Sequence, residues 1–587
     1  MEGDVMKNYF THFGELYRYL ENQPKKENFL NHRLPQEYQQ FSKEEFLLTV
    51  RYLALSFYQH KWRSRQIGIA ISSSPYWIML DYALMISGAI SVPLFTNISS
   101  KNLYYQILDA NIETVFVESQ EQENSIHIIE KNIEIIYLSK HVFGCRTFLE
   151  YVAEGKKIDE AEPSLFGTLI YQIKPTDIAT IVYTSGTSGK PKGVELTHKN
   201  LISQIHAIEK KYLFYKESDI AFSFLPLAHI FERTIMNFYL SKELSIYFAD
   251  DVKNIVLLLD EVKPTVMTVV PRVIEKFFFK MKHKALEGNI GKQLLVYLAF
   301  YRATTKDPTK KINVLDKVLD TLVYKKLRQA LGGNIRMMIS GGASLSDMLY
   351  RFYFNIGVPL YQGYGLTEAS PVICANTPLE NKIGTCGKVF PRTRVMIDKE
   401  GELLAQGDGI MKGYHNDKIA THQAIDVDRW LHTGDLASID EAGFITITGR
   451  NKELLKTSTG EYVSSVYIEQ KLLNNGWFDH AIVVGDDRPF VVALLFANPD
   501  FLGRFATKIK STPSKTLQSA KFHKMTKKYI AKINKKLNDW EKIRDFRFIS
   551  EYPTIEAGEL TPSMKLAKKR LLERYTYEID EMYKDHL

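Results

Sequence analysis

The chain has 587 residues, of which 45% are hydrophobic and 25% charged, and its net charge is +8. This length predicts roughly two to four domains, and the composition excludes disordered, collagen-like and disulfide-rich classes. The three cysteines, Cys145, Cys374 and Cys386, include no Cys-x-x-Cys pair, so neither a disulfide framework nor a cysteine zinc site is predicted.

The N-terminal sequence MEGDVMKNYF carries Glu2 and Asp4 where a secretory signal is basic, and no continuous apolar segment follows. We therefore expect no signal peptide and a cytoplasmic location, with peripheral contact at a membrane left open. Few cysteines also fit a reducing compartment.

The most apolar stretch runs from Trp77 to Phe95 and imitates a membrane span. It contains Asp81, and an aspartate at mid-membrane depth costs roughly 2.5–3.5 kcal/mol. A buried helix followed by a strand is the better interpretation. Ser74 before Pro75 is typical of an N-cap with proline at the first helical position.

Short β-rich runs alternate with helical patterns over the first two-thirds of the chain, at residues 67–72, 89–95, 114–118 and 265–270. This pattern is typical of a layered α/β domain with a largely parallel sheet. From about Gly384 the sequence becomes hairpin-like, as in RVMID-KEGE-LLAQG and ASID-EAG-FITITG, where acidic residues and glycine form the turns. After Arg450 a shorter segment predicts a separate small domain.

Basic residues are most concentrated between Lys521 and Arg544. A basic helix can contact nucleic acid or an anionic membrane. Apolar residues recur there at helical spacing, which favours a solvated helix with one buried face. These apolar residues are Tyr529, Ile530, Ile533 and Leu537. We expect no nucleic-acid partner and only weak membrane contact.

The sequence IVYTSGTSGKPKGVELTHKN, residues 181–200, places a Ser/Thr/Gly loop with lysines between apolar strands. Its glycines let backbone amides turn toward one anion, its hydroxyls add donors and its lysines add charge. The phosphate-binding candidates are Thr184, Ser185, Gly186, Thr187, Ser188, Gly189, Lys190 and Lys192. The loop is not a Walker A motif, because Lys190 is followed by Pro191 and a strand-like segment. The alternative is a flexible polar hairpin.

TSGTSGKPKG resembles the phosphate loop of the adenylate-forming superfamily, which includes acyl-CoA synthetases, luciferases and peptide-synthetase adenylation domains. The superfamily's other motifs follow in order between about residue 40 and residue 575. LPLAHIFER and GEYV are most similar to the long-chain fatty acyl-CoA synthetases, although Gly449 stands where many of those have aspartate. The resemblance implies an α/β fold: a large layered α/β N-terminal domain with a β-rich subdomain, plus a small mobile α+β C-terminal domain.

The resemblance also implies where the domains divide. Residues 1–449 would form the ATP- and acyl-binding domain, and residues 453–587 would form a lid. The hinge would be residues 450–452, with Lys452 as the pivot.

The implied ATP site draws on three further motifs. MISGGASLS would bind adenine, since paired glycines at a strand end let a flat base approach the backbone. In YQGYGLTEAS, Tyr364 would stack on adenine, Thr367 would donate to the α-phosphate and Glu368 would hold magnesium together with Thr184. In WLHTGDLA, residues 430–437, Asp435 would accept hydrogen bonds from both ribose hydroxyls. Arg450 would also contact the ribose. The accompanying cofactor-binding positions are Gly341, Gly342, Ala343, Gln362, Gly363 and Gly365.

His229, in FLPLAHIFER, would be the gate between the acyl pocket and the thiol tunnel, with a positional and not an acid–base role. A histidine after an apolar run is otherwise more often a core residue. Its neighbours Glu232 and Arg233 are expected to pair with each other or with solvent. Lys456 and Gly460 would face the thiol-bearing arm, although Lys456 is equally well explained as a surface lysine.

Lys565, in GELTPSMKLAKKR, matches the superfamily's catalytic lysine near the C-terminus. A lysine there would offset the repulsion between a carboxylate and the phosphate that it attacks. The Leu-Thr-Pro turn before it favours Lys565 over Lys568, Lys569 and Arg570.

The resemblance therefore implies an enzyme that activates a long-chain fatty acid with Mg²⁺ and ATP and passes it to coenzyme A. Three alternatives stay open. The acceptor is an acyl carrier protein, the acid is another apolar acid, or the chain is a non-catalytic nucleotide and lipid sensor.

Overall fold

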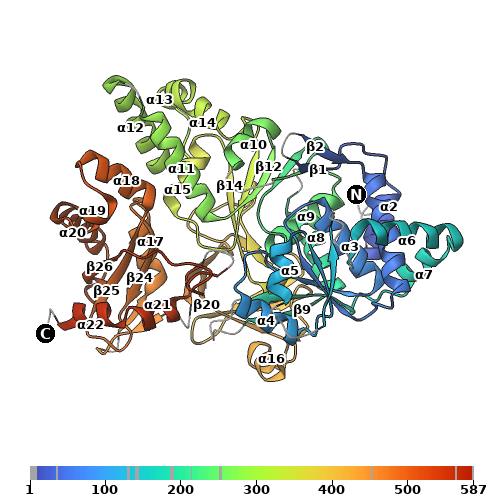
Figure 1. The fold of residues 1–587 in the computed structure, drawn as a ribbon. Coiled ribbons are helices and arrows are strands. Elements are labelled where there is room, and N and C mark those ends of the chain that lie inside the picture. The colour runs from blue at the N-terminus through green and yellow to red at the C-terminus, as the bar shows by residue number, and fades with distance from the viewer. Residues whose placement is uncertain are drawn as a thin grey trace.

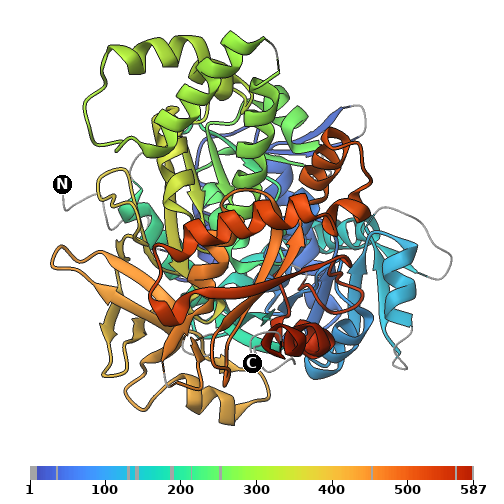
Figure 2. The ribbon, with the colours of Figure 1, turned by 90° about the vertical axis from the view of Figure 1, so that its left-hand side faces the viewer.

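The computed structural model describes residues 10–34, 37–127, 132–138, 145–184, 191–212, 215–249, 254–287, 289–450, 454–459, 461–561 and 565–584. A large N-terminal domain contains two sheets and their covering helices, and a smaller C-terminal domain lies against one side of it (Figure 1). Figure 2 looks onto that side, with the strands of the small domain in front.

The first sheet has eight strands in the order β19-β9-β8-β4-β3-β5-β6-β7. The strands from β8 to β7 in this order run parallel, and β9 and β19 complete the sheet in antiparallel pairing. Three of the predicted strands, 67–72, 89–95 and 114–118, are here and are confirmed. The bounds are β3 (Gln66–Ala70), β4 (Ile90–Pro93), β5 (Thr114–Val117), β6 (Glu134–Tyr137), β7 (Arg146–Thr147), β8 (Ile178–Thr184), β9 (Lys192–Thr197) and β19 (Gly413–Tyr414).

The second sheet has nine strands in the order β16-β15-β14-β13-β12-β10-β11-β1-β2. Its central strands, from β14 to β1, are parallel, and antiparallel strands lie at both edges. The predicted strand at 265–270 is β12. The bounds are β1 (Leu30–Arg33), β2 (Tyr38–Phe41), β10 (Ile220–Ser223), β11 (Ser245–Phe248), β12 (Val266–Val269), β13 (Met337–Ser340), β14 (Leu360–Gly365), β15 (Val372–Ala375) and β16 (Lys388–Val389).

Helices cover both sheets of the large domain (Figure 1). Their bounds are α1 (Phe13–Glu21), α2 (Lys43–Gln59), α3 (Pro75–Ser87), α4 (Ser100–Asp109), α5 (Gln120–His127), α6 (Phe148–Ala161), α7 (Leu165–Tyr171), α8 (His198–Lys211), α9 (Ile230–Ser241), α10 (Ile255–Val262), α11 (Pro271–Ala285), α12 (Ile290–Thr305), α13 (Val314–Leu319), α14 (Lys325–Gln329) and α15 (Asp347–Asn355).

Helix α3 explains the stretch that imitates a membrane span. The Ser74 hydroxyl caps it by accepting from the Trp77 amide at 3.3 Å, and Pro75 is its first residue, as predicted. Every residue of α3 except Tyr76 is buried, so its apolar composition reflects a place in the core. Among the described helices, none is long and apolar enough to cross a membrane.

The β-rich subdomain is a four-stranded antiparallel sheet in the order β17-β18-β20-β21. Its outer pairs, β17 with β18 and β20 with β21, are the two predicted hairpins, which are confirmed. The bounds are β17 (Thr393–Ile397), β18 (Glu402–Gly407), α16 (Lys418–Ala424), β20 (Leu431–Ile439) and β21 (Ile445–Arg450).

The C-terminal domain surrounds β25, whose residues alternate between two apolar clusters and so fill both faces of a three-stranded sheet. The apolar face of α20 is confirmed, because Ile530, Ile533 and Leu537 are buried and Tyr529 is partly buried. The bounds are β22 (Leu454–Lys456), β23 (Tyr462–Ser464), α17 (Ser465–Leu473), β24 (Phe478–Val484), β25 (Val491–Ala497), α18 (Pro499–Lys508), α19 (Pro513–Leu517), α20 (Ala520–Asn534), β26 (Ile543–Ile549), α21 (Lys568–Arg574) and α22 (Thr576–Lys584).

Candidate active site

Helix α9 begins directly after His229, and its first turn is fastened to both sheets of the large domain. The guanidinium of Arg233 donates from Nε and Nη2 to the two carboxylate oxygens of Asp81 in α3, at 2.8 and 2.5 Å. Its Nη1 donates to the hydroxyl of Thr180 in β8 at 2.8 Å. These three side chains fix α9 against the eight-stranded sheet.

Glu232 points to the other sheet. Its carboxyl group accepts from the Ser223 hydroxyl at 2.7 Å and from the Thr268 hydroxyl at 2.5 Å, on β10 and β12. The expectation that Glu232 and Arg233 pair with each other or with solvent is wrong, because both are buried and their partners lie on different sheets. Burial raises the pKa of Glu232 to about 7, although the two hydroxyls oppose this shift.

His229 is half-buried at the start of this helix, with its ring edge-on to Phe95 at 5.0 Å between centroids. Burial, and secondly the positive charge of Lys565, lower the pKa of His229 to about 4. The imidazole is therefore neutral near pH 7, as a positional role requires. The charge of Lys565, in the C-terminal domain, therefore acts on His229 in the large domain.

Lys565 is hydrogen-bonded to Thr561 through its backbone. Its carbonyl accepts from the Thr561 amide at 2.8 Å, and its amide donates to the Thr561 hydroxyl at 3.0 Å. Leu560 and Leu566 pair on either side as an isolated bridge. By contrast, Lys568 forms a 2.8 Å ion pair with Glu469 inside the C-terminal domain. Of these two lysines, Lys565 is the one whose charge acts on His229.

Asp435 and Arg450 face each other across the β20–β21 hairpin, where their Cα atoms are register partners. The Arg450 Nε donates to one carboxylate oxygen of Asp435 at 2.8 Å, and the Tyr364 hydroxyl donates to the other at 2.6 Å. Asp435 is only 2% exposed. The structure therefore brings together three of the residues predicted for adenosine binding.

The backbone around Tyr364 is irregular and depends on glycine. A β-bulge lies between Tyr364 and Gly365 in β14. A Cβ atom on Gly365 would lie 1.8 Å from the Pro371 carbonyl oxygen, so no other residue fits this position. Gly363 pairs with Ala375, and Gln362 is buried beneath them.

The first of the two glycines after β13, Gly341, packs against α9. A Cβ atom on Gly341 would lie 2.8 Å from the Phe231 ring, and Gly342 has φ +78°, which favours glycine. Ala343 follows in an exposed position. The predicted adenine loop is therefore in direct contact with the helix that carries His229.

Glu368 lies next to the end of the phosphate-loop strands. Its carboxylate accepts from the Tyr414 hydroxyl at 2.8 Å, and the Lys192 ammonium lies 4.6 Å from the centroid of the Tyr414 ring. Thr184 pairs with Lys192 across β8 and β9, and Thr367 starts the 3₁₀ turn (Thr367–Ala369) that holds Glu368. Tyr414 therefore bridges the predicted metal ligand and a predicted phosphate ligand.

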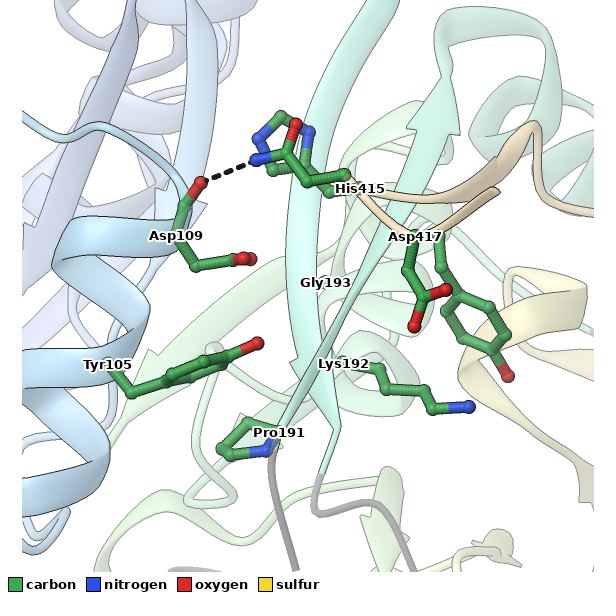
Figure 3. A pocket seen from close by; sticks show the side chains of 9 residues that line it. Tyr105, Asp109, Pro191, Lys192, Gly193, His415 and Asp417 are labelled. Carbon is green, nitrogen blue, oxygen red and sulfur yellow. Dashed lines mark hydrogen bonds between the residues drawn. The ribbon is translucent and has the colours of Figure 1, made fainter. Parts of the chain in front are cut away.

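Lys192 and Tyr414 also line a polar pocket of about 150 Å³ (Figure 3). In it, Asn416 donates to the Asp109 carbonyl at 2.9 Å, and the hydrogen bond that the His415 ring donates to the Glu195 carboxylate raises the pKa of His415. Sequence reasoning missed Tyr414, because no motif carries it and only strand pairing with β9 brings it here. The lining residues are Tyr105, Asp109, Pro191, Lys192, Gly193, Tyr414, His415, Asn416 and Asp417.

Lys456 is exposed at the end of β22, where its amide donates to Asp486 at 2.9 Å and its ammonium lies 5.7 Å from the Tyr462 ring centroid. Several predicted site residues lie outside the described residues. They are Ser185, Gly186, Thr187, Ser188, Gly189, Lys190, Lys452 and Gly460.

Comparisons with known proteins agree with this geometry. Residues 16–415 match the family described as AMP-binding enzyme, and residues 452–587 match the AMP-binding enzyme C-terminal domain. Long-chain-fatty-acid–CoA ligase FadD15 of Mycobacterium tuberculosis is 32% identical over 530 residues, which cover 88% of this chain and 87% of the relative. Long-chain-fatty-acid–CoA ligase 6 of Homo sapiens is 28% identical, with 93% and 83% covered.

Among solved structures, the adenylation domain of a carboxylate reductase from Mycobacterium chelonae aligns with a TM-score of 0.75 at 19% identity, covering 99% of this chain and 92% of that one. The anthranilate CoA ligase AuaEII, solved with anthranoyl-AMP, aligns with a TM-score of 0.70 at 18% identity, covering 98% and 99%. These two likenesses support the fold. The α/β class and the superfamily resemblance are confirmed, and the chain belongs to the AMP-binding enzyme family.

Proposed function

We propose that the protein is a long-chain fatty acid–CoA ligase that forms an acyl-AMP from a fatty acid and ATP and then transfers the acyl group to coenzyme A. The observation that carries this proposal is the hydrogen-bonded cluster of Tyr364, Asp435 and Arg450, in which three residues predicted for adenosine binding meet from separate motifs. Lys565 supports the proposal, because its charge acts on His229 of the large domain. The names of the relatives support the choice of fatty acid and coenzyme A.

In the first half-reaction, a carboxylate oxygen attacks the α-phosphorus of ATP, and the bond to the pyrophosphate oxygen breaks. The attacking and attacked groups are both anionic, so Lys565 stabilises the transition state by bridging them. Asp435 and Arg450 bind the ribose, Tyr364 and the loop Gly341–Ala343 hold the adenine, and Thr367 donates to the α-phosphate.

Glu368 and Thr184 are suitable ligands for Mg²⁺. Both offer oxygen, and Mg²⁺ is usually held by one or two carboxylates together with substrate phosphates. The single Glu368 carboxylate beside Lys192 and Tyr414 fits that arrangement. When bound, the ion would neutralise the charge that develops on pyrophosphate.

In the second half-reaction, the C-terminal domain (residues 453–587) turns relative to residues 1–449 about the hinge 450–452, with Lys452 as the pivot. The rotation withdraws Lys565 and brings Lys456 and Gly460 toward the thiol, which enters beside His229. The thiol sulfur then attacks the acyl carbon, and AMP leaves.

Two neighbouring functions share the same site. In the first, the acceptor is the pantetheine thiol of an acyl carrier protein, and the basic helix α20 offers a surface complementary to an acidic carrier protein. In the second, the substrate is another apolar acid. Both keep the adenylation chemistry. A cytoplasmic location with peripheral membrane contact also belongs to the proposal.

The test is pyrophosphate release from the purified protein with Mg-ATP and fatty acids from hexanoate to eicosanoate, with and without coenzyme A. We expect release that needs a long-chain acid and increases with coenzyme A. Release that is indifferent to coenzyme A would favour a carrier protein. No release with any acid would contradict fatty acid activation and favour another acid or a non-catalytic sensor.

A further inference from the structure

Helix α12 is apolar on two opposite faces. Its inner face, which includes Ala299 and Phe300, is buried against the large domain. A helix side that meets solvent is ordinarily polar, yet the outer face of α12 carries five large apolar side chains at helical spacing. They are Ile290, Leu294, Tyr297, Leu298 and Tyr301, exposed by 84, 70, 56, 43 and 68%.

The segment that follows repeats this pattern. Leu319 and Val323 point inward and are buried. The outward apolar residues are Ile312, Val314, Val318 and Leu322, exposed by 70, 78, 45 and 49%. Arg302 and Lys306 of α12 both donate to Asp316 of α13, at 3.0 and 2.6 Å, so the two segments lie side by side (Figure 1). We call the nine exposed apolar residues the α12–α13 face.

This face is surrounded by positive charge. Between Ile290 and Lys326 the chain has eight lysines and arginines and three aspartates. Asp316 is paired with Arg302 and Lys306, and Asp320 is paired with Arg328. Six lysines of this segment are exposed, namely Lys292, Lys310, Lys311, Lys317, Lys325 and Lys326.

An apolar face bordered by lysines is complementary to an anionic lipid surface, because apolar side chains enter the headgroup region while the lysines meet lipid charges. We infer that the protein docks on anionic membranes through the α12–α13 face. This inference assigns a surface and a lipid charge to the peripheral membrane contact of the proposed function. It uses no step of the adenylation or thioester chemistry, so the docking surface and the catalysis stand or fail separately. Figure 1 places α12 and α13 on the outside of α11 and α15, at one end of the molecule.

Two other arrangements are less consistent with the structure. The basic helix α20, where the sequence left weak membrane contact open, has its apolar residues Phe522, Ile530 and Ile533 buried and offers mainly lysine charge. A second copy of the chain would also cover an apolar face, but it would bring the same exposed lysines, and like charges that face each other across an interface oppose association. The α12–α13 face combines both features that a membrane requires.

The test is co-sedimentation of the full chain with vesicles of phosphatidylcholine alone and of phosphatidylcholine mixed with phosphatidylglycerol. We expect binding to the mixed vesicles that weakens with added salt, because salt screens the lysine charges. One variant, Leu294→Gln with Tyr301→Gln, removes apolar area and keeps helix-forming residues. A second, Lys310→Glu with Lys311→Glu, reverses charge.

We expect the charge variant to weaken partitioning at least roughly thirtyfold and the apolar variant roughly tenfold. Matched controls should bind like the unmodified protein. They are Lys527→Glu with Lys528→Glu on α20, and Ile419→Gln with Tyr577→Gln, whose side chains are exposed by 74 and 72%.

Three outcomes would overturn the inference. The first is that the protein does not bind anionic vesicles at low salt. The second is that the α20 variant loses binding while the α12–α13 variants keep it. The third is that the protein forms a dimer in solution and the variant Leu294→Gln with Tyr301→Gln dissociates it. The last would assign the face to a second copy. Circular dichroism and pyrophosphate release with a long-chain acid in the absence of vesicles should be unchanged in each variant.

Discussion

Arg233 and Asp81 form a two-pronged ion pair in which each side chain is 1% exposed. The pair joins α9, which begins at His229, to α3 in the core of the large domain. On the other side of the same helix turn, Glu232 accepts hydrogen bonds from Ser223 and Thr268 of the nine-stranded sheet. The position of His229 is therefore set by two buried ionisable side chains, Arg233 and Glu232, whose hydrogen bonds run in different directions.

The first prediction concerns the stability of this pair. In Asp81→Ala the guanidinium is left buried without its counter-charge, so we expect a loss of about 3–5 kcal/mol in the free energy of unfolding. The double variant Asp81→Leu with Arg233→Met should recover most of it, because an apolar replacement removes both desolvation costs. Denaturant unfolding of both variants measures this. A loss below about 1 kcal/mol in Asp81→Ala would mean that solvent reaches the pair.

The second prediction concerns the pH dependence of stability at Glu232. The folded pKa of about 7 lies above the ordinary value of 4.5, so the folded protein holds a proton that the unfolded chain releases between these pH values. The stabilisation is complete below pH 4.5 and is lost as pH rises to 7. Relative to Glu232→Gln, the unmodified protein should lose on the order of 3 kcal/mol across this window.

Thermal unfolding of both proteins from acid to neutral pH measures this difference. Ser223→Ala is a useful companion, since the Ser223 hydroxyl lowers the pKa of Glu232. Without that donor the window should extend to higher pH. A difference between unmodified protein and Glu232→Gln that does not change with pH would show that Glu232 stays ionised in the fold.

The third prediction concerns Lys565. Lys565→Ala should lower pyrophosphate release roughly 10²- to 10³-fold, since it removes one donor from a charged transition state. ATP affinity and transfer from preformed acyl-AMP to coenzyme A should change little. Lys568→Ala is the matched control, because Lys568 is engaged with Glu469. Unchanged adenylation in Lys565→Ala would remove this residue from the mechanism, and the sensor hypothesis would then regain support.

The fourth prediction concerns ribose recognition by Asp435. In Asp435→Asn a charged acceptor is lost, and hydrogen bonds to charged groups contribute about 1.5–3 kcal/mol. We therefore expect ATP affinity to fall roughly ten- to hundredfold. Tyr364→Phe should have a smaller effect, since it removes one donor to Asp435.

Calorimetric titration with a non-hydrolysable ATP analogue measures these affinities. Asp440→Asn serves as a control, because Asp440 lies at the turn of the same hairpin and pairs with Lys382. Equal losses at positions 435 and 440 would indicate that the hairpin is disturbed and that Asp435 has no specific role.

The sequence by itself determined the local elements. The Ser74 cap, the strands at 67–72 and 265–270 and the two β-hairpins follow from hydrophobic periodicity and turn residues, which act over a few neighbouring positions. The order of the motifs also indicated the family, because the chemistry of each short motif can be inferred from its own residues.

Only the tertiary structure decided which side chains meet. Arg233 and Asp81 are 152 residues apart, and Tyr364 and Asp435 are 71 apart. Hydrophobic periodicity indicates which residues are buried, but it does not indicate which element packs over them. The partners of Glu232 and Arg233 were therefore predicted wrongly. The outer face of α12 was missed for the same reason. A sequence with apolar residues on all sides of a helix predicts a core helix, and only the tertiary packing shows that one side of α12 is exposed to solvent.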